Sequence, residues 1–408
     1  MRYLVTGAAG FVGSHLAERL VAAGHDVLGV DSFTDYYDPE RKRENARDLD
    51  VLEADLVSAD LEPLLDGVDG VFHLAGQPGV RASFGPGFEA YVERNVRASG
   101  RVFETAARRR VRVVYASSSS VYGDAESYPT REDARPRPIS PYGVTKLCVE
   151  HLAYAHASTT GLEAVGVRYF TVYGPRQRPD MAFTSLLEAL ADGGPFHLFG
   201  DGTASRSFTF VGDAVDATVA AMERGRPGEL YNVGGGEEAT MADAIALAEE
   251  ISGRTLALER HAAAAGDVRR TRADVEKAEA ELGWHPTTSL ADGGSFRLFG
   301  DGSASRSFTF VGDAVDATLA AMARGGAGEV YNVGGGDEAT MAQVIALAEQ
   351  ISGTTLSVER HGAATGDVRR TRADVAKAEH ELDWRPTTGL EDGLRAQWAW
   401  VAGRVAAP

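Results

Sequence analysis

The first half of the chain alternates short apolar runs with longer mixed stretches. Buried strands are predicted at the apolar runs 2–5, 26–30, 68–76, 111–119 and 161–170. The stretches between them read as helices, and the first of these directly follows a glycine-rich turn. Strands that alternate with helices indicate βαβ units and a parallel sheet. We therefore expect an α/β protein whose first half is a Rossmann-type, doubly wound parallel sheet.

A change in composition near residue 174 predicts a second, smaller domain. Glycine and proline become frequent there, although no sharp linker separates the two parts. We expect the Rossmann domain to occupy residues 1–173 and a smaller α/β domain to occupy residues 174–290.

The second half of the chain contains an internal duplication. Residues 191–290 (copy 1) and 291–390 (copy 2) are identical at 78 of 100 positions. Without one copy the chain would have 308 residues, which suits two domains rather than three. The period lies far above the roughly 20–50 residues of solenoid repeats. We expect copy 2 to be an appended duplicate of most of the smaller domain, followed by a tail helix at 391–408.

Only one copy can complete a site with the single Rossmann domain. We expect copy 1 to do so, because it follows residue 190 directly and needs no looped-out segment. The entropy of loop closure differs little between the two arrangements and favours copy 1 only weakly. Copy 2 would then pack on the body of the protein, pack on another subunit, or swap between chains. Both copies keep the same four positions, Phe199/Phe299, Arg206/Arg306, Asp213/Asp313 and Asp267/Asp367.

Charge and cysteine content limit the partners and the compartment. The formal net charge is -18, with 59 acidic and 41 basic residues, which argues against a nucleic acid or an anionic membrane as partner. The lone Cys148 cannot form an internal disulfide, which fits a reducing cytoplasm. No apolar run reaches the roughly 18 residues of a membrane helix. The early position of Gly7 leaves no room for a signal peptide. We expect a cytoplasmic protein.

A glycine loop predicts a dinucleotide site near the start of the chain. Gly7, Gly10 and Gly13 lie between the first strand and the first helix, where a helix N-terminus and close backbone approach favour a pyrophosphate. The alternative is a tight turn without a ligand. Asp31 ends the second strand, where a carboxylate accepts hydrogen bonds from a ribose diol and repels a 2′-phosphate, which favours NAD over NADP. Asp55 stands where it could contact adenine or be an isolated surface acid.

A tyrosine and a lysine four residues apart form the candidate catalytic pair. Tyr142 and Lys146 share one helix face, and a neighbouring ammonium would lower the pKa of the phenol so that it can act as a base. The serines at 117–120 end an apolar strand, the edge at which open α/β sheets place their sites. An exposed helix face and a turn at the strand end are the alternative interpretations.

With these residues in place, the chain resembles the nucleotide-sugar epimerases of the extended short-chain dehydrogenase/reductase family. The resemblance rests on TGAAGFVGSHL, DSFTDYYDPERKREN, HLAGQPGVR, YASSSSVYG, SPYGVTK and RYFTVYGPRQRPDMA, and covers residues 1–290 and copy 2. It is strongest to UDP-glucuronate 4-epimerases and their UDP-glucose relatives. It implies a catalytic triad of Ser118, Tyr142 and Lys146. It also implies NAD as cofactor, with further contacts from Phe11, Val12, Leu56, Leu74, Ala75 and Tyr169.

The resemblance implies a reaction that begins with proton removal. Tyr142 would take the proton of the sugar 4-hydroxyl, NAD would take the hydride from carbon 4, and Ser118 would bind the same oxygen. Lys146 would hold the nicotinamide ribose. The 4-keto sugar would turn over and accept the hydride on its other face. Related dehydratases carry Asp-Glu after the triad residue, and decarboxylases keep a Glu at the second of these positions, whereas this chain has Ser119 and Ser120.

The resemblance also places substrate contacts in both halves of the chain. Thr171 and Arg178 would read the substituent at carbon 5 of the sugar, where hydroxyl and guanidinium groups suit a carboxylate. Arg178 could instead serve the nucleotide or be solvated, and Arg81 is a weaker candidate. In the smaller domain, which would bind the nucleotide, the contacts would be Phe199 to uracil, Arg206 to phosphate and Asp267 near ribose. Family members usually have a polar or basic residue where Ala264 and Ala364 stand.

Three functions are compatible with the sequence. The leading one is 4-epimerisation of UDP-glucuronate, the second is 4-epimerisation of UDP-glucose, and the third is a catalytically idle NAD-binding scaffold with copy 2 as its interaction surface. The complete Ser-Tyr-Lys set argues against the third. We expect no metal cofactor, a UDP-sugar as ligand and, as is usual in the family, a homodimer.

Overall fold

A computed structural model divides the chain into two compact units, Met1–Gly293 (unit 1) and Gly294–Pro408 (unit 2), and each is considered by itself. Within them the structure describes residues 1–235, 238–264, 266–288, 290, 296–299, 301–326, 329–334, 337–353, 358–361 and 370–405. No helix among these residues has the length and apolar character needed to span a bilayer.

A seven-stranded parallel sheet forms the centre of unit 1, in the order β10-β6-β5-β4-β1-β2-β3. The order reverses between β1 and β4, which creates the switch point at which doubly wound sheets bind ligands. The predicted Rossmann-type sheet is therefore confirmed. Its strands are β1 (Arg2–Thr6), β2 (Asp26–Asp31), β3 (Val51–Glu53), β4 (Gly70–His73), β5 (Arg112–Ser118), β6 (Ala164–Tyr169) and β10 (Leu230–Val233).

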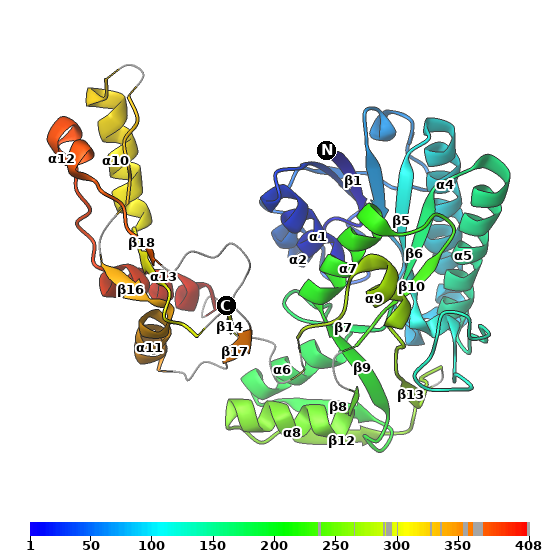
Figure 1. Cartoon of the computed structure of the whole chain (residues 1–408). Helices are drawn as coiled ribbons and strands as arrows, with labels where there is room; N and C mark the ends of the chain where they lie inside the picture. Colours follow the sequence, from blue (N-terminus) through cyan, green and yellow to red (C-terminus); the bar gives the residue numbers. More distant parts are fainter. Residues whose placement is uncertain are drawn as a thin grey trace. The chain divides into compact units, whose positions relative to one another are not determined.

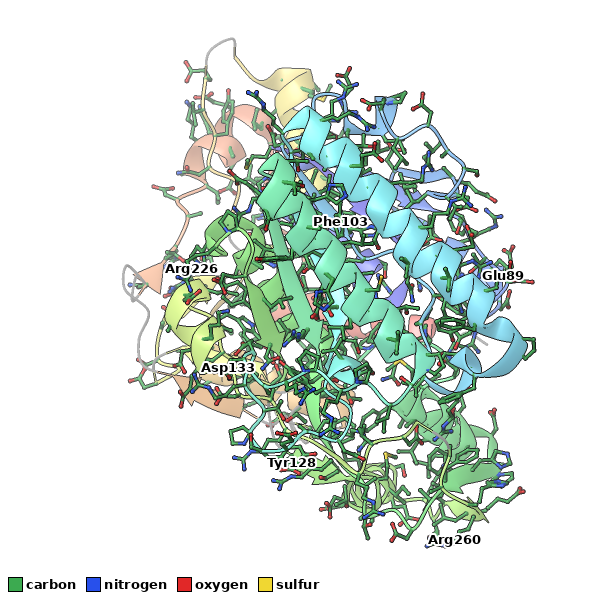
Figure 2. All side chains as sticks on the ribbon, turned by 90° about the vertical axis from the view of Figure 1, so that its right-hand side faces the viewer. Glu89, Phe103, Tyr128, Asp133, Arg226 and Arg260 are labelled. Atoms are coloured by element: carbon green, nitrogen blue, oxygen red, sulfur yellow. The ribbon has the colours of Figure 1, made fainter. Side chains whose placement is uncertain are left out.

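Helices cover both faces of this sheet, because neighbouring strand residues point to opposite sides. Phe72 faces the core under α1 (Phe11–Ala22) and α7 (Val211–Arg224), whereas Val71 faces the core under α4 (Ala98–Arg109) and α5 (Pro141–Thr160). Figure 1 shows these two helix layers. Figure 2 shows α4 and α5 side by side, with Phe103 between them and the sheet, where its ring lies 5.3 Å from that of Tyr115.

A smaller lobe of unit 1 is built on short sheets. A four-stranded sheet contains β7, β9, β11 and β13, and a two-stranded parallel sheet contains β8 and β12, which α6 and α8 cover with the apolar side chains of one small core. The strands are β7 (Thr171–Tyr173), β8 (Pro195–Phe199), β9 (Ser205–Phe210), β11 (Glu238–Thr240), β12 (Ala257–His261) and β13 (Arg270–Thr271). The remaining α-helices of unit 1 are α2 (Pro39–Asn45), α3 (Phe88–Tyr91), α6 (Ala182–Asp192), α8 (Met241–Ser252) and α9 (Glu276–Leu282).

Short helical turns connect several of these elements. They are the 3-10 helices η1 (Pro63–Leu65), η2 (Arg81–Ser83), η3 (Gly85–Gly87) and η5 (Ser119–Val121), and the π-helix η4 (Val92–Arg97) that leads into α4.

The large sheet includes a strand from beyond the predicted domain boundary at residues 173/174. β10 and α7 both belong to copy 1, yet β10 pairs with β6 and α7 packs against β5, β6 and α1. The physical reason is their apolar surface, because Val211, Val215 and Val233 are buried in the sheet's core. Copy 1 therefore contributes to both lobes of unit 1, and the Rossmann part does not end where glycine becomes frequent.

Unit 2 repeats the local structure of the smaller lobe. Its sheets pair β14 with β17, and β15 with β16 and β18, in the same registers as their counterparts in copy 1. The strands are β14 (Phe296–Phe299), β15 (Ser305–Ser307), β16 (Glu338–Thr340), β17 (Val358–His361) and β18 (Arg370–Thr371). The helices are α10 (Val311–Arg324), α11 (Met341–Ser352), α12 (Ala376–Leu382) and α13 (Leu390–Val405).

The two copies differ in what covers one helix face. In copy 1, Val211 is 2% and Met222 is 8% exposed, because α7 lies on the large sheet. The matching residues of α10, Val311 and Met322, are 69% and 82% exposed. The segment that corresponds to β10 forms no strand in unit 2. The same sequence pattern therefore has a buried face in copy 1 and an uncovered face in copy 2.

Candidate active site

A pocket of about 420 Å³ opens at the carboxyl ends of the parallel strands, on both sides of the switch point. Its size is within the usual range for small-molecule sites, roughly 300–1,000 Å³. Predicted cofactor residues line it together with the predicted catalytic ones. The lining contains Gly7, Gly10, Phe11, Val12, Asp31, Asp55, Leu56, Leu74, Ala75, Ser118, Ser119, Ser120, Tyr142, Lys146, Tyr169, Thr171 and Arg178.

The glycine loop follows β1 and is shaped by close backbone contacts. Gly7 has φ +73°, and a Cβ there would lie 2.8 Å from the backbone nitrogen of Ala75, so another residue would be strained and crowded. The amide of Gly10 donates to the carbonyl of Gly7 at 3.0 Å, and α1 begins at the next residue. Gly13 does not line the pocket. A side chain there would collide with the carbonyl of Gly7, so its role is to let α1 approach the loop.

The carboxylate of Asp31 is held at the end of β2. Its oxygens accept hydrogen bonds from the backbone amides of Ala9 at 3.1 Å and Phe33 at 2.9 Å. Lys42, which the sequence analysis did not single out, also lines the pocket, and its Nζ donates to the carbonyl of Thr34 at 2.6 Å. Burial lowers the pKa of Lys42, while the negative charge of Asp31 acts in the opposite direction. The adenosine end of the pocket therefore contains a cation as well as the expected acid.

Asp55 lines the pocket and also stabilises a local turn. Its Oδ1 accepts a hydrogen bond from the amide of Val57 at 2.8 Å. The structure is thus compatible with the predicted adenine contact, and because Asp55 is exposed it is equally compatible with a surface acid.

The predicted catalytic side chains converge from β5 and α5. Ser118 is the last residue of β5, and Tyr142 and Lys146 occupy the first turns of α5. The helix begins here because Ser140 caps it, with its Oγ accepting from the amide of Gly143 at 3.1 Å, and because Pro141 stands at the first helical position. The hydroxyl of Ser118 is hydrogen-bonded to that of Tyr142.

The pKa of Tyr142 differs from the sequence-based expectation. Burial raises it, the hydrogen bond from Ser118 lowers it, and the opposing positive charge comes from Arg178. The Nζ of Lys146 lies 6.0 Å from the centre of the Tyr142 ring and donates to the carbonyl of Ala116 at 3.0 Å, so its role beside Tyr142 stays a prediction. Spacing along a helix places two residues on one face, but here the backbone of β5 attracts the ammonium.

A buried ion pair behind Lys146 was missed by sequence reasoning. Glu150 binds Arg168 through two hydrogen bonds of 2.8 Å, and Ser117 donates to the same carboxylate at 2.5 Å. Burial lowers the pKa of Lys146 to about 8, and the charge of Glu150 opposes this shift. One feature of the sequence could have identified Glu150: Tyr142, Lys146 and Glu150 follow one another at intervals of four residues.

Arg178 lies in the pocket with part of its charge already paired. Its Nε and Nη2 donate to the carboxylate of Asp180 at 3.0 and 3.1 Å. Tyr36 donates to the same carboxylate at 3.1 Å, and both Tyr36 and Tyr37 line the pocket. The interpretation of Arg178 as a solvated residue is therefore not supported, and the guanidinium lies near Tyr142 in the region predicted for the sugar.

The predicted nucleotide contacts form a second group in the smaller lobe of unit 1. The guanidinium of Arg81 lies 4.0 Å above the ring of Phe199 and binds Asp267 at 2.7 Å. Arg206 is close enough for the charges of Arg81 and Asp267 to influence its pKa, which burial lowers. None of these four side chains is in the pocket lining. Arg81 therefore accompanies the nucleotide residues rather than the sugar residues with which the sequence analysis placed it.

Several counterparts in copy 2 lie outside what the structure describes. Asp367 and Ala364 are not among the described residues, and the side chain of Phe299 is not described either. The equivalence of the two copies is therefore visible only in their described strands and helices.

Comparisons with known proteins agree with this geometry. The model of the NAD dependent epimerase/dehydratase family matches residues 3–234, and the model of GDP-mannose 4,6 dehydratase matches residues 293–397. An uncharacterized UDP-glucose epimerase of Bacillus subtilis is 42% identical over 304 residues, 72% of this chain and 95% of that protein. The UDP-glucuronate 4-epimerase of Thermodesulfobacterium geofontis is 35% identical over 305 residues, 71% of this chain and 93% of that protein.

A solved structure shares the fold as well. The UDP-glucuronic acid 4-epimerase of Bacillus cereus, in complex with UDP-glucuronic acid and NAD, matches with a TM-score of 0.70 and 40% identity, over 72% of this chain and 96% of that chain.

Proposed function

Because the chain belongs to the NAD-dependent epimerase/dehydratase family, we propose that it catalyses the 4-epimerisation of UDP-glucuronate to UDP-galacturonate. The observation that carries the proposal is the convergence of Ser118, Tyr142 and Lys146 on a pocket that also contains the glycine loop and Asp31. The first group can move a proton at a sugar hydroxyl, and the second can hold a dinucleotide.

The residues present fit NAD. Gly7 and Gly10 line the pocket beside the start of α1, and a Cβ at Gly7 would collide with the backbone of Ala75, so the close loop that a pyrophosphate needs depends on glycine there. Asp31 would bind the adenosine ribose, and Asp55 and Leu56 would contact the adenine. Lys146 would hold the second ribose. Bound NAD supplies the hydride acceptor for carbon 4 of the sugar and the donor for the return step.

The protein's own contribution is to hold and move one proton. Tyr142, as phenolate, accepts the proton of the sugar 4-hydroxyl and later returns it. A hydrogen bond from Ser118 and the charge of Arg178 favour the charged form of Tyr142 before the sugar binds, and the hydroxyl of Ser118 would then donate to the sugar oxygen instead. Burial still leaves the pKa of this phenol above its ordinary value, so both groups reduce the cost of forming the phenolate without cancelling it.

The choice of glucuronate rests on the residues near Arg178. Thr171 offers a hydroxyl and Arg178 a positive charge in the part of the pocket next to Tyr142. A sugar carboxylate suits this environment better than a hydroxymethyl group does. The pairing of Arg178 with Asp180 removes part of that charge, so UDP-glucose is kept as the second candidate.

Water elimination fits the site less well. The positions after Ser118 are Ser119 and Ser120, both of which line the pocket without supplying an acid. Epimerisation requires no further acid, because the proton taken by Tyr142 is returned to the same oxygen.

The experiment is incubation of the NAD-loaded protein with UDP-glucuronate or UDP-glucose, with products identified by NMR. We expect UDP-galacturonate from the first sugar at the higher kcat/KM, and Arg178→Met should lower kcat/KM more for UDP-glucuronate than for UDP-glucose. A higher kcat/KM for UDP-glucose would assign the second function. Absence of any product from either sugar would contradict the proposal.

A further inference from the structure

The outer face of the two-stranded sheet in unit 1 brings two histidines and a glutamate together. His197 lies on β8, and Glu259 and His261 lie on β12. The register pairs His197 with Glu259 and Phe199 with His261. Alternate residues of β8 point inward, so Phe196 and Leu198 fill the small core while His197 points outward. Figure 2 marks this strand pair through Arg260, at the lower edge of unit 1.

One possible ligand atom from each of the three side chains lies within 4.8 Å of the others. Nδ1 of His197 lies 3.0 Å from Nε2 of His261, and each ring nitrogen lies 3.5 Å from a carboxylate oxygen of Glu259. Zinc bonds of about 2.0–2.2 Å in tetrahedral geometry separate neighbouring ligands by about 3.3–3.5 Å. The two 3.5 Å contacts reach different oxygens of Glu259, and the two rings are hydrogen-bonded to each other, so rotation of these side chains would bring one atom from each onto a shared ion.

We propose that His197, Glu259 and His261 form a binding site for a zinc-type divalent metal ion. Two imidazoles and a carboxylate select Zn²⁺ and its transition-metal neighbours over Mg²⁺ or Ca²⁺, which prefer oxygen ligands. Three protein ligands leave a fourth position for water. This site lies outside the pocket of the proposed reaction and takes no part in its proton transfer.

The role that the geometry assigns to the ion is a clip between β8 and β12. One ligand comes from β8 and two come from β12, so the ion adds a cross-link to a sheet of two strands. The ring of His261 also stacks on Phe199 at 5.0 Å, and the guanidinium of Arg81 lies 4.0 Å from the ring of Phe199. An ion that fixes His261 would therefore also fix the ring of Phe199, which is one of the predicted nucleotide contacts.

The corresponding position in copy 2 lacks one of the three proposed ligands. Arg297 occupies the register position of His197 opposite Glu359, and His361 is retained. Arginine has no lone pair available for a metal. We therefore expect one zinc ion per chain rather than two.

The test is equilibrium dialysis of the untagged full chain against micromolar Zn²⁺ alone, followed by measurement of metal content per chain. We expect one ion in the wild-type protein and in the control His151→Arg, which changes an exposed histidine on α5. We expect none at this site in His197→Arg. Equal zinc content in the wild-type protein and His197→Arg, or no zinc in the wild-type protein, would overturn the proposal.

Thermal unfolding supplies a second readout. Zinc should raise the Tm of the wild-type protein, because an ion that binds the folded state stabilises it, and should leave the Tm of His197→Arg unchanged. Glu259→Gln removes the charged ligand and should give a smaller shift than the wild-type protein. Retained NAD content in each variant shows that the fold is intact. An equal rise in Tm for the wild-type protein, His197→Arg and Glu259→Gln would contradict a metal cross-link between β8 and β12.

Discussion

Tyr142 combines two opposing influences in a single side chain. Its position near Ser118 and Arg178 favours the phenolate, while burial raises the pKa of the phenol. The ease with which the phenolate forms thus depends on residues from β5 and from the segment after β7 as well as on α5. Activity should increase as the pH rises through the pKa of this phenol, because only the deprotonated form can accept the sugar proton.

Replacement of Tyr142 by phenylalanine tests this role directly. We expect Tyr142→Phe to lower kcat at least about 10²-fold, the lower end of what a positioned general base contributes. NAD content should not change, because the hydroxyl rather than the ring is removed. Product formation followed by NMR measures the effect. The matched control is Tyr154→Phe on the same helix, where the side chain is 66% exposed and should be dispensable. Wild-type turnover in Tyr142→Phe would disprove the mechanism.

At the scale of elements, His73 joins β4 to a strand and a helix beside it. Its Nδ1 lies 2.8 Å from the hydroxyl of Thr6 on β1, and its Nε2 lies 2.9 Å from that of Ser99 on α4. Burial lowers the pKa of His73 to about 3, so the ring is neutral in the folded protein at neutral pH. This contact between the sheet and α4 therefore depends on an uncharged imidazole.

The pKa of His73 predicts how stability depends on pH. In the unfolded chain a histidine binds its proton near pH 6.5, whereas the folded protein does not protonate this ring until about pH 3. Between these values the unfolded state holds more protons, so the free energy of unfolding decreases as the pH falls. A single group contributes a slope of up to about 1.4 kcal/mol per pH unit. We expect His73→Asn to have a smaller slope than the wild-type protein between pH 7 and pH 5.

Urea denaturation at several pH values measures this difference. His151→Gln, which changes an exposed histidine of α5, serves as the control and should keep the wild-type slope. Equal slopes for the wild-type protein and His73→Asn would show that His73 does not contribute.

At the scale of the whole molecule, the question is which copy serves the active site. Copy 1 supplies β10 and α7 to the large sheet, and its Asp267 binds Arg81 of the Rossmann part. In unit 2 the matching helix α10 leaves Val311 and Met322 exposed. These observations support the proposal that copy 1 completes the site and that copy 2 is an addition to a two-lobed enzyme.

Deletion of residues 291–390 should therefore leave a folded and active enzyme. The join brings the tail helix α13 directly after residue 290, and NAD content and kcat/KM should stay close to those of the full chain. Deletion of 191–290 is the matched variant, since it removes the same length and takes away β10 and α7 while joining residue 190 to copy 2, which is identical to copy 1 at 78 of 100 positions. An inactive first variant together with an active second variant would reverse the assignment of the copies.

Local patterns along the chain were sufficient to predict the main strands, part of the candidate site and the duplication. Apolar runs predicted the main strands, because periodicity depends on immediate neighbours in sequence. Of the residues predicted for the cofactor, Gly7, Gly10 and Asp31 line the pocket, whereas Gly13 does not. The spacing of Tyr142 and Lys146 predicted a shared helix face for the same reason. The near-identity of 191–290 and 291–390 was also visible directly.

Tertiary structure decided the features that join distant segments. The sequence could not show that β10 extends the large sheet, that Arg81 meets Phe199 and Asp267, or that Glu150 is buried with Arg168. It also did not show that Arg178 contributes positive charge near Tyr142, or that Lys146 donates to a strand carbonyl. Burial, ion pairing and pKa depend on which elements pack together, and periodicity along one element does not contain that information.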